Sequence, residues 1–195
     1  MITAIILASG FSRRMGEDKL LMKIGGKPLV EWVIREIKQS NVEDIILIYR
    51  KFEVKDIGLK YNIKTVFNEN AHLGQSEALK LGIKNSKPDT NAYMFFVGDQ
   101  LFINKYIINL LMEEYQKTTF PILIPCYDGK EGNPVVFSSI LRSELLKIDG
   151  DRGGKVIIEK HPKDFKKIHI KNGKIGLDID TPKDFKKIKE VIVKN

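Results

Sequence analysis

Short apolar runs alternate with amphipathic stretches along most of the chain, and this alternation limits the fold more than any other feature. Runs rich in β-branched and aromatic residues, typical of strands, lie at 3–7, 44–49, 63–66, 92–97, 122–125, 134–137 and in a late run ending near Asp178. Segments with helical spacing lie between or after them, at 29–39, 76–85, 105–117, 139–148, 154–160 and 182–191. Repeated strand-helix-strand units predict an α/β fold, with a mostly parallel sheet covered by helices on both faces.

The run at 134–137 differs from the others because it opens on a proline. Pro134 has no N–H to give to a strand ladder, so we expect this strand to be antiparallel or to lie at an edge. The sequence contains no internal repeat, low-complexity tract or linker that would divide it, and 195 residues fit one globular unit. We therefore expect a single domain over residues 1–195.

Composition narrows the classes of partner. The net charge is +8, from 33 Lys and Arg against 25 Asp and Glu, but the lysines are spread along the chain without an aromatic-interleaved basic stripe. The net charge alone would allow nucleotides, phosphorylated metabolites or nucleic acid as partners. The spread of the lysines indicates instead that most of them are solvated surface residues, and we do not expect nucleic acid as a partner. Cys126 is a single cysteine and the three histidines (His72, His161, His169) lie far apart, so neither a disulfide framework nor a zinc cluster is expected. The lack of a signal peptide or membrane span predicts a cytoplasmic protein.

Chemically informative residues follow three of the expected strands. Ligands of parallel sheets bind at the carboxyl ends of the strands, where segments distant in sequence meet at one rim. These residues are Ser9, Gly10, Ser12, Arg13, Arg14, Gly16 and Lys19 after the first strand, Gly98, Asp99 and Gln100 after the fourth, and Asp178, Asp180 and Thr181 after the last. Their expected convergence is the main functional signal of the sequence.

The loop after the first strand has the composition of a phosphate-binding loop. Small residues let backbone N–H groups approach phosphate oxygens, and arginine and lysine neutralise the charge. Neither a G-x-G-x-x-G fingerprint nor a P-loop is present, since Gly25-Gly26-Lys27 is followed by Pro28 instead of Ser or Thr. The alternative is that the glycines only form turns and the arginines are solvated.

Six ordered segments resemble the MobA-like nucleotidyltransferase family. The first, LASGFSRRMGEDKLL (7–21), is similar to the signature loop of that family. The others are GQSEALKLGI (74–83), GDQ (98–100), GNPVVF (132–137), GDRGGKVII (150–158) and DIDTPKDF (178–185). The resemblance implies a Rossmann-like fold of the GT-A type and an Mg²⁺-dependent enzyme that transfers a nucleoside monophosphate from an NTP to a phosphorylated acceptor, with release of pyrophosphate.

Within the family, the loops resemble the cytidylyl branch. Guanylyl members typically carry L-A-G-G and G-P-L-A-G, whereas this chain has LASG at 7–10 and GQSEA at 74–78. The resemblance implies that CTP is the donor, the terminal phosphate of molybdopterin is the acceptor and molybdopterin cytosine dinucleotide is the product. A molybdoenzyme that receives the product is a further partner that the resemblance suggests.

The resemblance also implies roles for individual residues. Nucleotide binding falls to Leu7, Ala8, Ser9, Gly10, Arg13, Arg14, Lys19, Gln75 and Ser76; catalysis to Arg13, Lys19 and Asp99; Mg²⁺ to Asp99 and Asp180; and the acceptor to Asn133, Asp151, Arg152 and Gly153. Catalysis of this kind depends on positioning, a metal and cations that stabilise charge on the phosphoryl oxygens, and it requires no protein nucleophile.

Other interpretations of the same residues remain open. Asp99 and Asp180 could be helix caps, Asp178 could replace Asp180 as a ligand, and Asp151 could cap the helix that follows it. Leu101 stands where the family usually has proline, which keeps open a non-catalytic, cofactor-binding chaperone of a molybdoenzyme. Guanylyl transfer from GTP, or cytidylyl transfer to a sugar phosphate or polyol phosphate, also stays open.

Overall fold

The computed structural model describes residues 1–177, 179 and 181–193. The strands are β1 (Ile2–Ala8), β2 (Lys23–Ile24), β3 (Lys27–Pro28), β4 (Asp44–Tyr49), β5 (Lys64–Phe67), β6 (Ala92–Val97), β7 (Ile122–Tyr127), β8 (Lys130–Glu131), β9 (Val135–Ser138) and β10 (Phe165–Ile170). The α-helices are α1 (Leu29–Lys38), α2 (Phe52–Lys60), α3 (Gln75–Asn85), α4 (Lys105–Gln116), α5 (Arg142–Leu145), α6 (Lys155–Lys160) and α7 (Pro182–Val193). The 3₁₀ turns among the described residues are η1 (Lys19–Leu21), η2 (Ala71–Leu73), η3 (Ser139–Leu141) and η4 (Gly173–Gly176).

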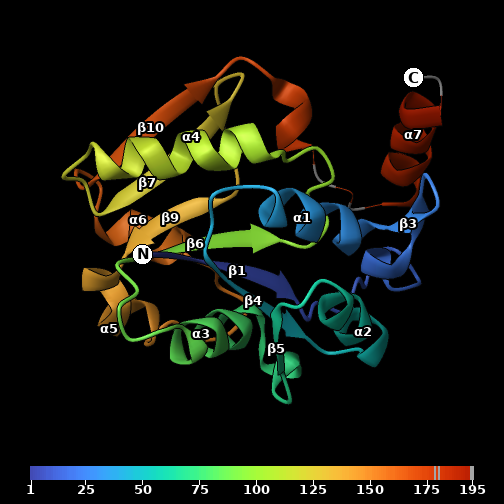
Figure 1. Cartoon of the computed structure of the whole chain (residues 1–195), viewed down its shortest axis with the longest axis horizontal. Coiled ribbons are helices and arrows are strands. Elements are labelled where there is room, and N and C mark those ends of the chain that lie inside the picture. The colour runs from blue at the N-terminus through green and yellow to red at the C-terminus, as the bar shows by residue number, and fades with distance from the viewer. Residues whose placement is uncertain (178, 180, 194–195) are drawn as a thin grey trace.

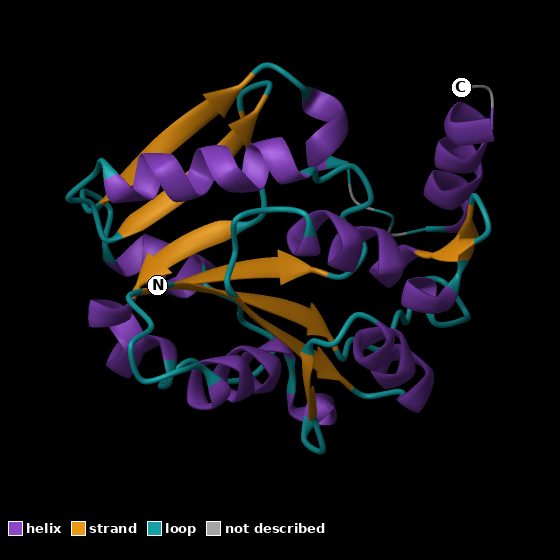
Figure 2. Ribbon diagram, in the orientation of Figure 1, coloured by secondary structure: helices purple, strands orange, loops and turns teal. Residues whose placement is uncertain are grey.

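One twisted sheet forms the centre of the molecule (Figure 2). Its strand order is β10-β7-β9-β6-β1-β4-β5, with β8 paired to β7. β1 runs parallel to both β4 and β6, β4 is parallel to β5, and β10 is parallel to β7. β9 is antiparallel to β6 and β7, which confirms an antiparallel strand, although it lies inside the sheet. Pro134 immediately precedes β9, so its missing N–H does not interrupt the ladder.

Helices cover both faces of this sheet, as the alternation predicted (Figure 1). In β1, Ala4 and Ile6 face a cluster that includes apolar residues of α1, α2 and α4. Ile5 points to the opposite face and packs with residues of α3, α5 and α6. Because successive strand residues alternate between faces, a strand that is apolar throughout requires this double cover.

Helix α2 was missed in the sequence. Its buried residues are Val54 and Gly58, while Phe52 and Leu59 are exposed, so its apolar spacing does not mark one face. Gly58 is needed because an added Cβ would lie 2.7 Å from the side chains of Leu47 and Thr65. The helix is therefore held by close backbone approach to the sheet, which a hydrophobic pattern does not reveal.

The prediction of a late strand ending near Asp178 was wrong. The last strand of the sheet is β10, and Gly173–Gly176 form the turn η4; Asp178 itself lies outside the described residues. In β10, buried Ile168 and Ile170 alternate with exposed Lys167 and His169, a pattern that suits an edge strand but dilutes its apolar signal.

The segment 139–148, expected as one helix, is instead the turn η3 followed by the short helix α5. Within the part of the chain described here, no helix has the length and apolar character needed to cross a membrane.

The order of the strands creates a crevice between β1 and β6. From β1 the chain proceeds to β4 and β5 on one side, and it then returns through α3 to β6 on the other side of β1. Such a switch point leaves the carboxyl ends of the two neighbouring strands open to a ligand. The loops that begin at Ser9 and Gly98 therefore meet at this rim.

Candidate functional site

The loop after β1 has a defined shape set by its own residues. Ser12 has φ 50° and Gly16 has φ 76°, so the chain turns twice in the left-handed region. The Met15 N–H donates to the Ser12 carbonyl at 2.8 Å, and the Lys19 N–H donates to Ser12 Oγ at 3.1 Å. These bonds fold residues 12–19 back on themselves and fix where the Lys19 side chain begins.

Lys19 and Asp99 meet at the rim between β1 and β6. The ammonium of Lys19 donates to Asp99 Oδ2, and Asp99 is only 5% exposed. This contact confirms that the residues after the first and fourth predicted strands converge. Asp99 does not cap α4, because Asn104 Oδ1 accepts from the Ile107 N–H at 3.1 Å and so occupies the capping position.

A small apolar cluster anchors the loop through Met15. Met15 from the loop packs with Leu101, which follows Asp99, and with Leu29 of α1 and Ile188 of α7. Leu101 is 7% exposed, so the residue that replaces the family's usual proline fills this cluster. The departure is therefore accommodated by apolar packing two residues after Asp99.

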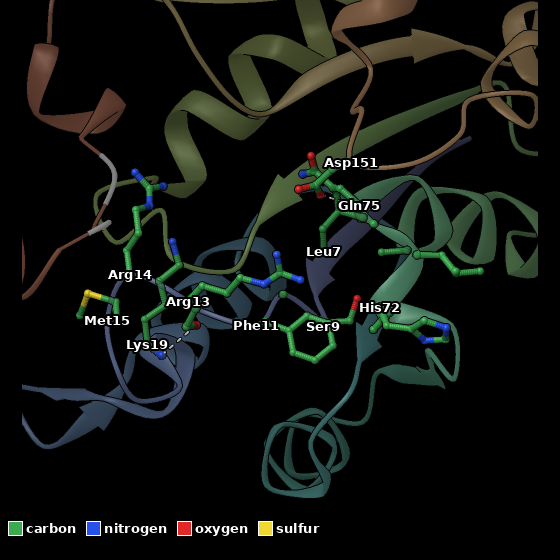
Figure 3. A pocket seen from close by; sticks show the side chains of 16 residues that line it. Leu7, Ser9, Phe11, Arg13, Arg14, Met15, Lys19, His72, Gln75 and Asp151 are labelled. Carbon is green, nitrogen blue, oxygen red and sulfur yellow. Dashed lines mark hydrogen bonds between the residues drawn. The ribbon is translucent and has the colours of Figure 1, made fainter.

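A pocket of about 540 Å³ lies beside this pair; Lys19 lines it and Asp99 does not. Figure 3 shows Arg13, Arg14 and Lys19 on one side and His72, Gln75 and Asp151 on the other. It is lined by Leu7, Ser9, Gly10, Phe11, Ser12, Arg13, Arg14, Met15, Lys19, Ala71, His72, Leu73, Gly74, Gln75, Ala78 and Asp151. Its volume is within the range of about 300–1,000 Å³ that is usual for small-molecule sites.

Two of the residues expected to bind nucleotide do not line this pocket. Ser76 is fully buried at the start of α3, where its N–H donates to the Gly150 carbonyl at 3.2 Å. Ala8 is 3% exposed and packs in the core beside β4. Both residues therefore support the pocket wall through their backbone and packing.

The four residues expected to bind the acceptor separate into different places. Asp151 lines the pocket and its Oδ1 accepts from the Gln75 N–H at 3.2 Å; it does not cap α6, whose N-cap is Gly154. Gly153 lies close to the same glutamine, since an added Cβ would be 3.0 Å from Gln75 Oε1. Arg152 instead lines a second hollow of about 430 Å³ beside α5 and α6.

Asn133 is held in place by the loop that carries Asp99. Its carbonyl accepts from Gln100 Nε2 at 2.5 Å and from the Tyr127 hydroxyl at 2.7 Å. Burial raises the pKa of Tyr127 well above its usual value, so the hydroxyl remains a donor at physiological pH. The Asn133 backbone is thus fixed relative to the rim while its side chain stays half-buried.

Sequence reasoning missed two residues that shape the site, Arg50 and Asn68. Each directly follows a strand, β4 and β5 respectively. Asn68 Nδ2 donates to Ser9 Oγ at 2.9 Å, and Arg50 donates to residues near both ends of the loop. Applying the carboxyl-end rule to these two strands as well would have identified both residues.

The described donors are compatible with a magnesium ion held partly by substrate. Residues 1–177, 179 and 181–193 contain no group of three or more His, Cys, Asp or Glu side chains able to hold a metal. Asp99 offers a hard carboxylate at the rim, and Mg²⁺ usually takes one or two carboxylates and completes its shell with phosphates and water. Asp180, the other expected ligand, lies outside the described residues.

Thr181 caps α7: its N–H donates to Asp184 Oδ2 at 2.9 Å, and its Oγ1 accepts from the Asp184 N–H at 3.3 Å.

Gly74, the residue before α3, packs closely against the loop at 150–153. It has φ 114°, and an added Cβ would lie 2.3 Å from the carbonyl carbon of Gly150. We expect Gly74→Ala to lower the free energy of unfolding by roughly 1–3 kcal/mol, because the new methyl group needs both a strained backbone and a shift of the 150–153 loop. Chemical denaturation measures this, with Gly10→Ala as the control, since Gly10 has open space around its Cβ direction. Equal stability of the two variants would contradict the close approach.

The chain is similar to several known proteins. The profile of the MobA-like NTP transferase domain matches residues 4–165. A probable molybdenum cofactor guanylyltransferase of Natranaerobius thermophilus is 35% identical over 134 residues, covering 66% of this chain and 62% of the relative. The bifunctional protein GlmU of Thermosipho africanus is 27% identical over 172 residues, covering 87% of this chain and 37% of the relative.

The fold is shared with solved structures. A manganese complex of Rv0371C from Mycobacterium tuberculosis H37Rv has a TM-score of 0.82 at 19% identity, with coverage of 97% of this chain and 98% of that chain. The chain spans less than two thirds of the length of the two sequence relatives. With the family profile matched over most of its length, the chain belongs to the MobA-like NTP transferase family.

Proposed function

We propose that this protein is a nucleotidyltransferase that moves CMP from CTP to the terminal phosphate of molybdopterin and releases pyrophosphate. The observation that carries the proposal is the meeting of Lys19 with Asp99 at the β1/β6 rim, beside a pocket lined by Arg13 and Arg14. Cations and a hard carboxylate at one switch point suit a bound triphosphate and the metal that accompanies it. Membership of the NTP transferase family supports the same reaction class.

In the proposed reaction, an oxygen of the acceptor phosphate attacks the α-phosphorus of CTP. The bond between this phosphorus and the bridging oxygen breaks, and that oxygen leaves with pyrophosphate. Arg13, Arg14 and Lys19 hold the phosphates and offset the charge that develops on them. A divalent ion held by Asp99 and the phosphates, Mg²⁺ in our proposal, would supply further positive charge and orient the α-phosphate. The protein contributes position and charge, without a covalent intermediate.

We expect CTP to be used in preference to GTP. Ser9 and Gln75, whose loops differ from the guanylyl pattern, both line the pocket, and Asn68 fixes the Ser9 hydroxyl. The preference rests on the resemblance of these two loops to the cytidylyl branch of the family. A competition assay with both nucleotides and molybdopterin, with the dinucleotide products separated by chromatography, measures the preference. Equal turnover would remove the base assignment and leave the reaction class in place.

GTP is the second candidate donor. The specific observation in its favour is the 35% identity to the relative named as a probable molybdenum cofactor guanylyltransferase. Predominant formation of the guanine dinucleotide in the same assay would establish this alternative. A sugar-phosphate or polyol-phosphate acceptor is tested by replacing molybdopterin in that assay.

A non-catalytic chaperone that only binds the cofactor would release no pyrophosphate from any NTP. The Lys19–Asp99 pair forms although Leu101 stands in place of proline, which favours the enzyme over this alternative. We further propose that the enzyme works in the cytoplasm, where NTPs are available, and passes its product to a molybdoenzyme.

A further inference from the structure

We infer that Arg50 is a positioning residue that fixes the phosphate-binding loop, defined as residues 9–19. Arg50 is the first residue after β4, and β4 lies beside β1 in parallel register, with Tyr49 opposite Ala8. The backbone of Arg50 therefore lies level with the beginning of the loop, and its side chain can reach the loop from there. This inference rests on the proposed function only where it concerns catalysis; the restraint on the loop is a property of the protein alone.

The Arg50 guanidinium joins the two ends of the loop. Nη2 donates to the carbonyl of Gly10, near the start, at 3.3 Å and to Oδ2 of Asp18, near the end, at 3.1 Å. A planar guanidinium offers several donors in a fixed geometry, so one side chain can hold two acceptors at once. Arg50, which is not part of the loop, thereby connects its two ends.

Through Asp18, this restraint reaches Lys19. Asp18 is the N-cap of η1, and its Oδ1 accepts from the Leu20 N–H at 3.2 Å. Lys19 is the first residue of η1, so the direction of its side chain depends on where this turn is held. Arg50 thus acts on the Lys19–Asp99 pair without touching it.

A third contact connects Arg50 to the pocket wall. Its guanidinium carbon lies 4.5 Å from the centre of the Phe11 ring, and Phe11 lines the pocket. Phe11 is 43% exposed, and Arg13 also lies over its ring, at 5.8 Å from the ring centre. A stacked arginine supplies both contact area and electrostatic attraction to the ring.

The burial of Asp18 distinguishes this contact from an ordinary surface ion pair. The Asp18 side chain is 6% exposed and that of Arg50 is 24% exposed. Exposed pairs contribute little, whereas removal of one partner from a buried carboxylate leaves an uncompensated charge. Lys51 also approaches Asp18 Oδ2, but at 4.0 Å and with a side chain 38% exposed. The neighbouring lysine is therefore a matched control with the same charge.

The test compares Arg50→Met, Arg50→Lys and Lys51→Met by two independent measurements. Hydrogen exchange of residues 9–20 in the nucleotide-free protein reports the loop itself. We expect roughly tenfold faster exchange there in Arg50→Met, an intermediate increase in Arg50→Lys and wild-type protection in Lys51→Met. If Arg50→Met does not fold, Arg50→Lys carries the test. Wild-type loop protection in every folded Arg50 variant, or equal loosening by Lys51→Met, would overturn the inference.

Steady-state kinetics of pyrophosphate release are the second measurement. We expect kcat to fall about tenfold or more in Arg50→Met because Lys19 is misplaced. We also expect a raised KM for the nucleotide, because the loosened loop carries Arg13 and Arg14 as well, and an unchanged KM for the acceptor. Partial rescue by Arg50→Lys separates positioning from a general loss of stability. If the wild-type protein releases no pyrophosphate from any NTP, the proposed function is refuted. Faster loop exchange in Arg50→Met would still support the restraint in that case. Unchanged kcat and nucleotide KM in Arg50→Met, with an active wild type, would overturn the catalytic part.

Discussion

Asp99→Asn should fold normally and lose Mg²⁺-dependent pyrophosphate release by about 100-fold or more. Asparagine keeps the size of the side chain but removes its charge, so it weakens both metal binding and the ion pair with Lys19. The local turn should survive, because the Leu101 N–H donates to the backbone carbonyl of residue 99 at 2.9 Å. Pyrophosphate release across a Mg²⁺ titration, together with thermal melting, measures both expectations.

Asp56→Asn is the matched control for this variant. Asp56 is an exposed residue of α2, so the same substitution there removes the same charge without touching the rim. Full activity of Asp99→Asn would remove the metal site from the mechanism. The same substitution at Asp180 tests the second proposed ligand, and full activity there with a defective Asp99→Asn would move that role to Asp178.

The periodic part of the fold was predictable because strands buried on both faces have strongly apolar sequences. The predicted strand 44–49 coincides with β4 and 92–97 coincides with β6, and both strands are almost completely buried. The convergence of Lys19 and Asp99 followed from one topological rule about carboxyl ends, without any knowledge of side-chain contacts. Elements that satisfy a simple burial pattern can therefore be predicted from a single sequence.

Elements whose position depends on close backbone contacts or on a sheet edge could not be predicted from the sequence. α2 depends on the close approach of Gly58 to the sheet, and β10 is a basic edge strand with one buried face. Gly154 is another case, because an added Cβ would lie 2.6 Å from the ring of Phe137. These constraints come from residues distant in sequence, and nothing in the local pattern reports them.

The same reasoning explains the uneven outcome for the site. Most positions of the predicted phosphate loop are local and line the pocket: residues 9–15 and Lys19 do, whereas Gly16 does not. The contacts of Arg50 depend on how separate loops pack. The same is true of the placement of Asp151 and Arg152 in two different hollows. Roles transferred by resemblance therefore agree with the pocket best where the motif is one continuous loop.

Lys19→Ala should slow transfer by about 100-fold or more while the protein remains folded. The Lys19 ammonium is the cation that contacts Asp99, and its side chain is only 20% exposed. Its removal takes away a preorganised positive charge and leaves the Asp99 carboxylate without that partner. The backbone N–H that binds Ser12 Oγ persists in the variant, so the shape of the loop should not change.

The kinetic pattern of Lys19→Ala should identify what the charge does. A charge that acts mainly in the transition state lowers kcat with little change in KM, whereas one that only binds the triphosphate raises KM for CTP at unchanged kcat. We expect the first pattern, because Lys19 sits against the carboxylate proposed to hold the metal. Lys23→Ala is the control, since Lys23 is an exposed residue of β2 four positions away. Wild-type kcat and nucleotide affinity in Lys19→Ala would show that this lysine is not part of the phosphate site, and Arg13 and Arg14 would then have to supply the charge alone.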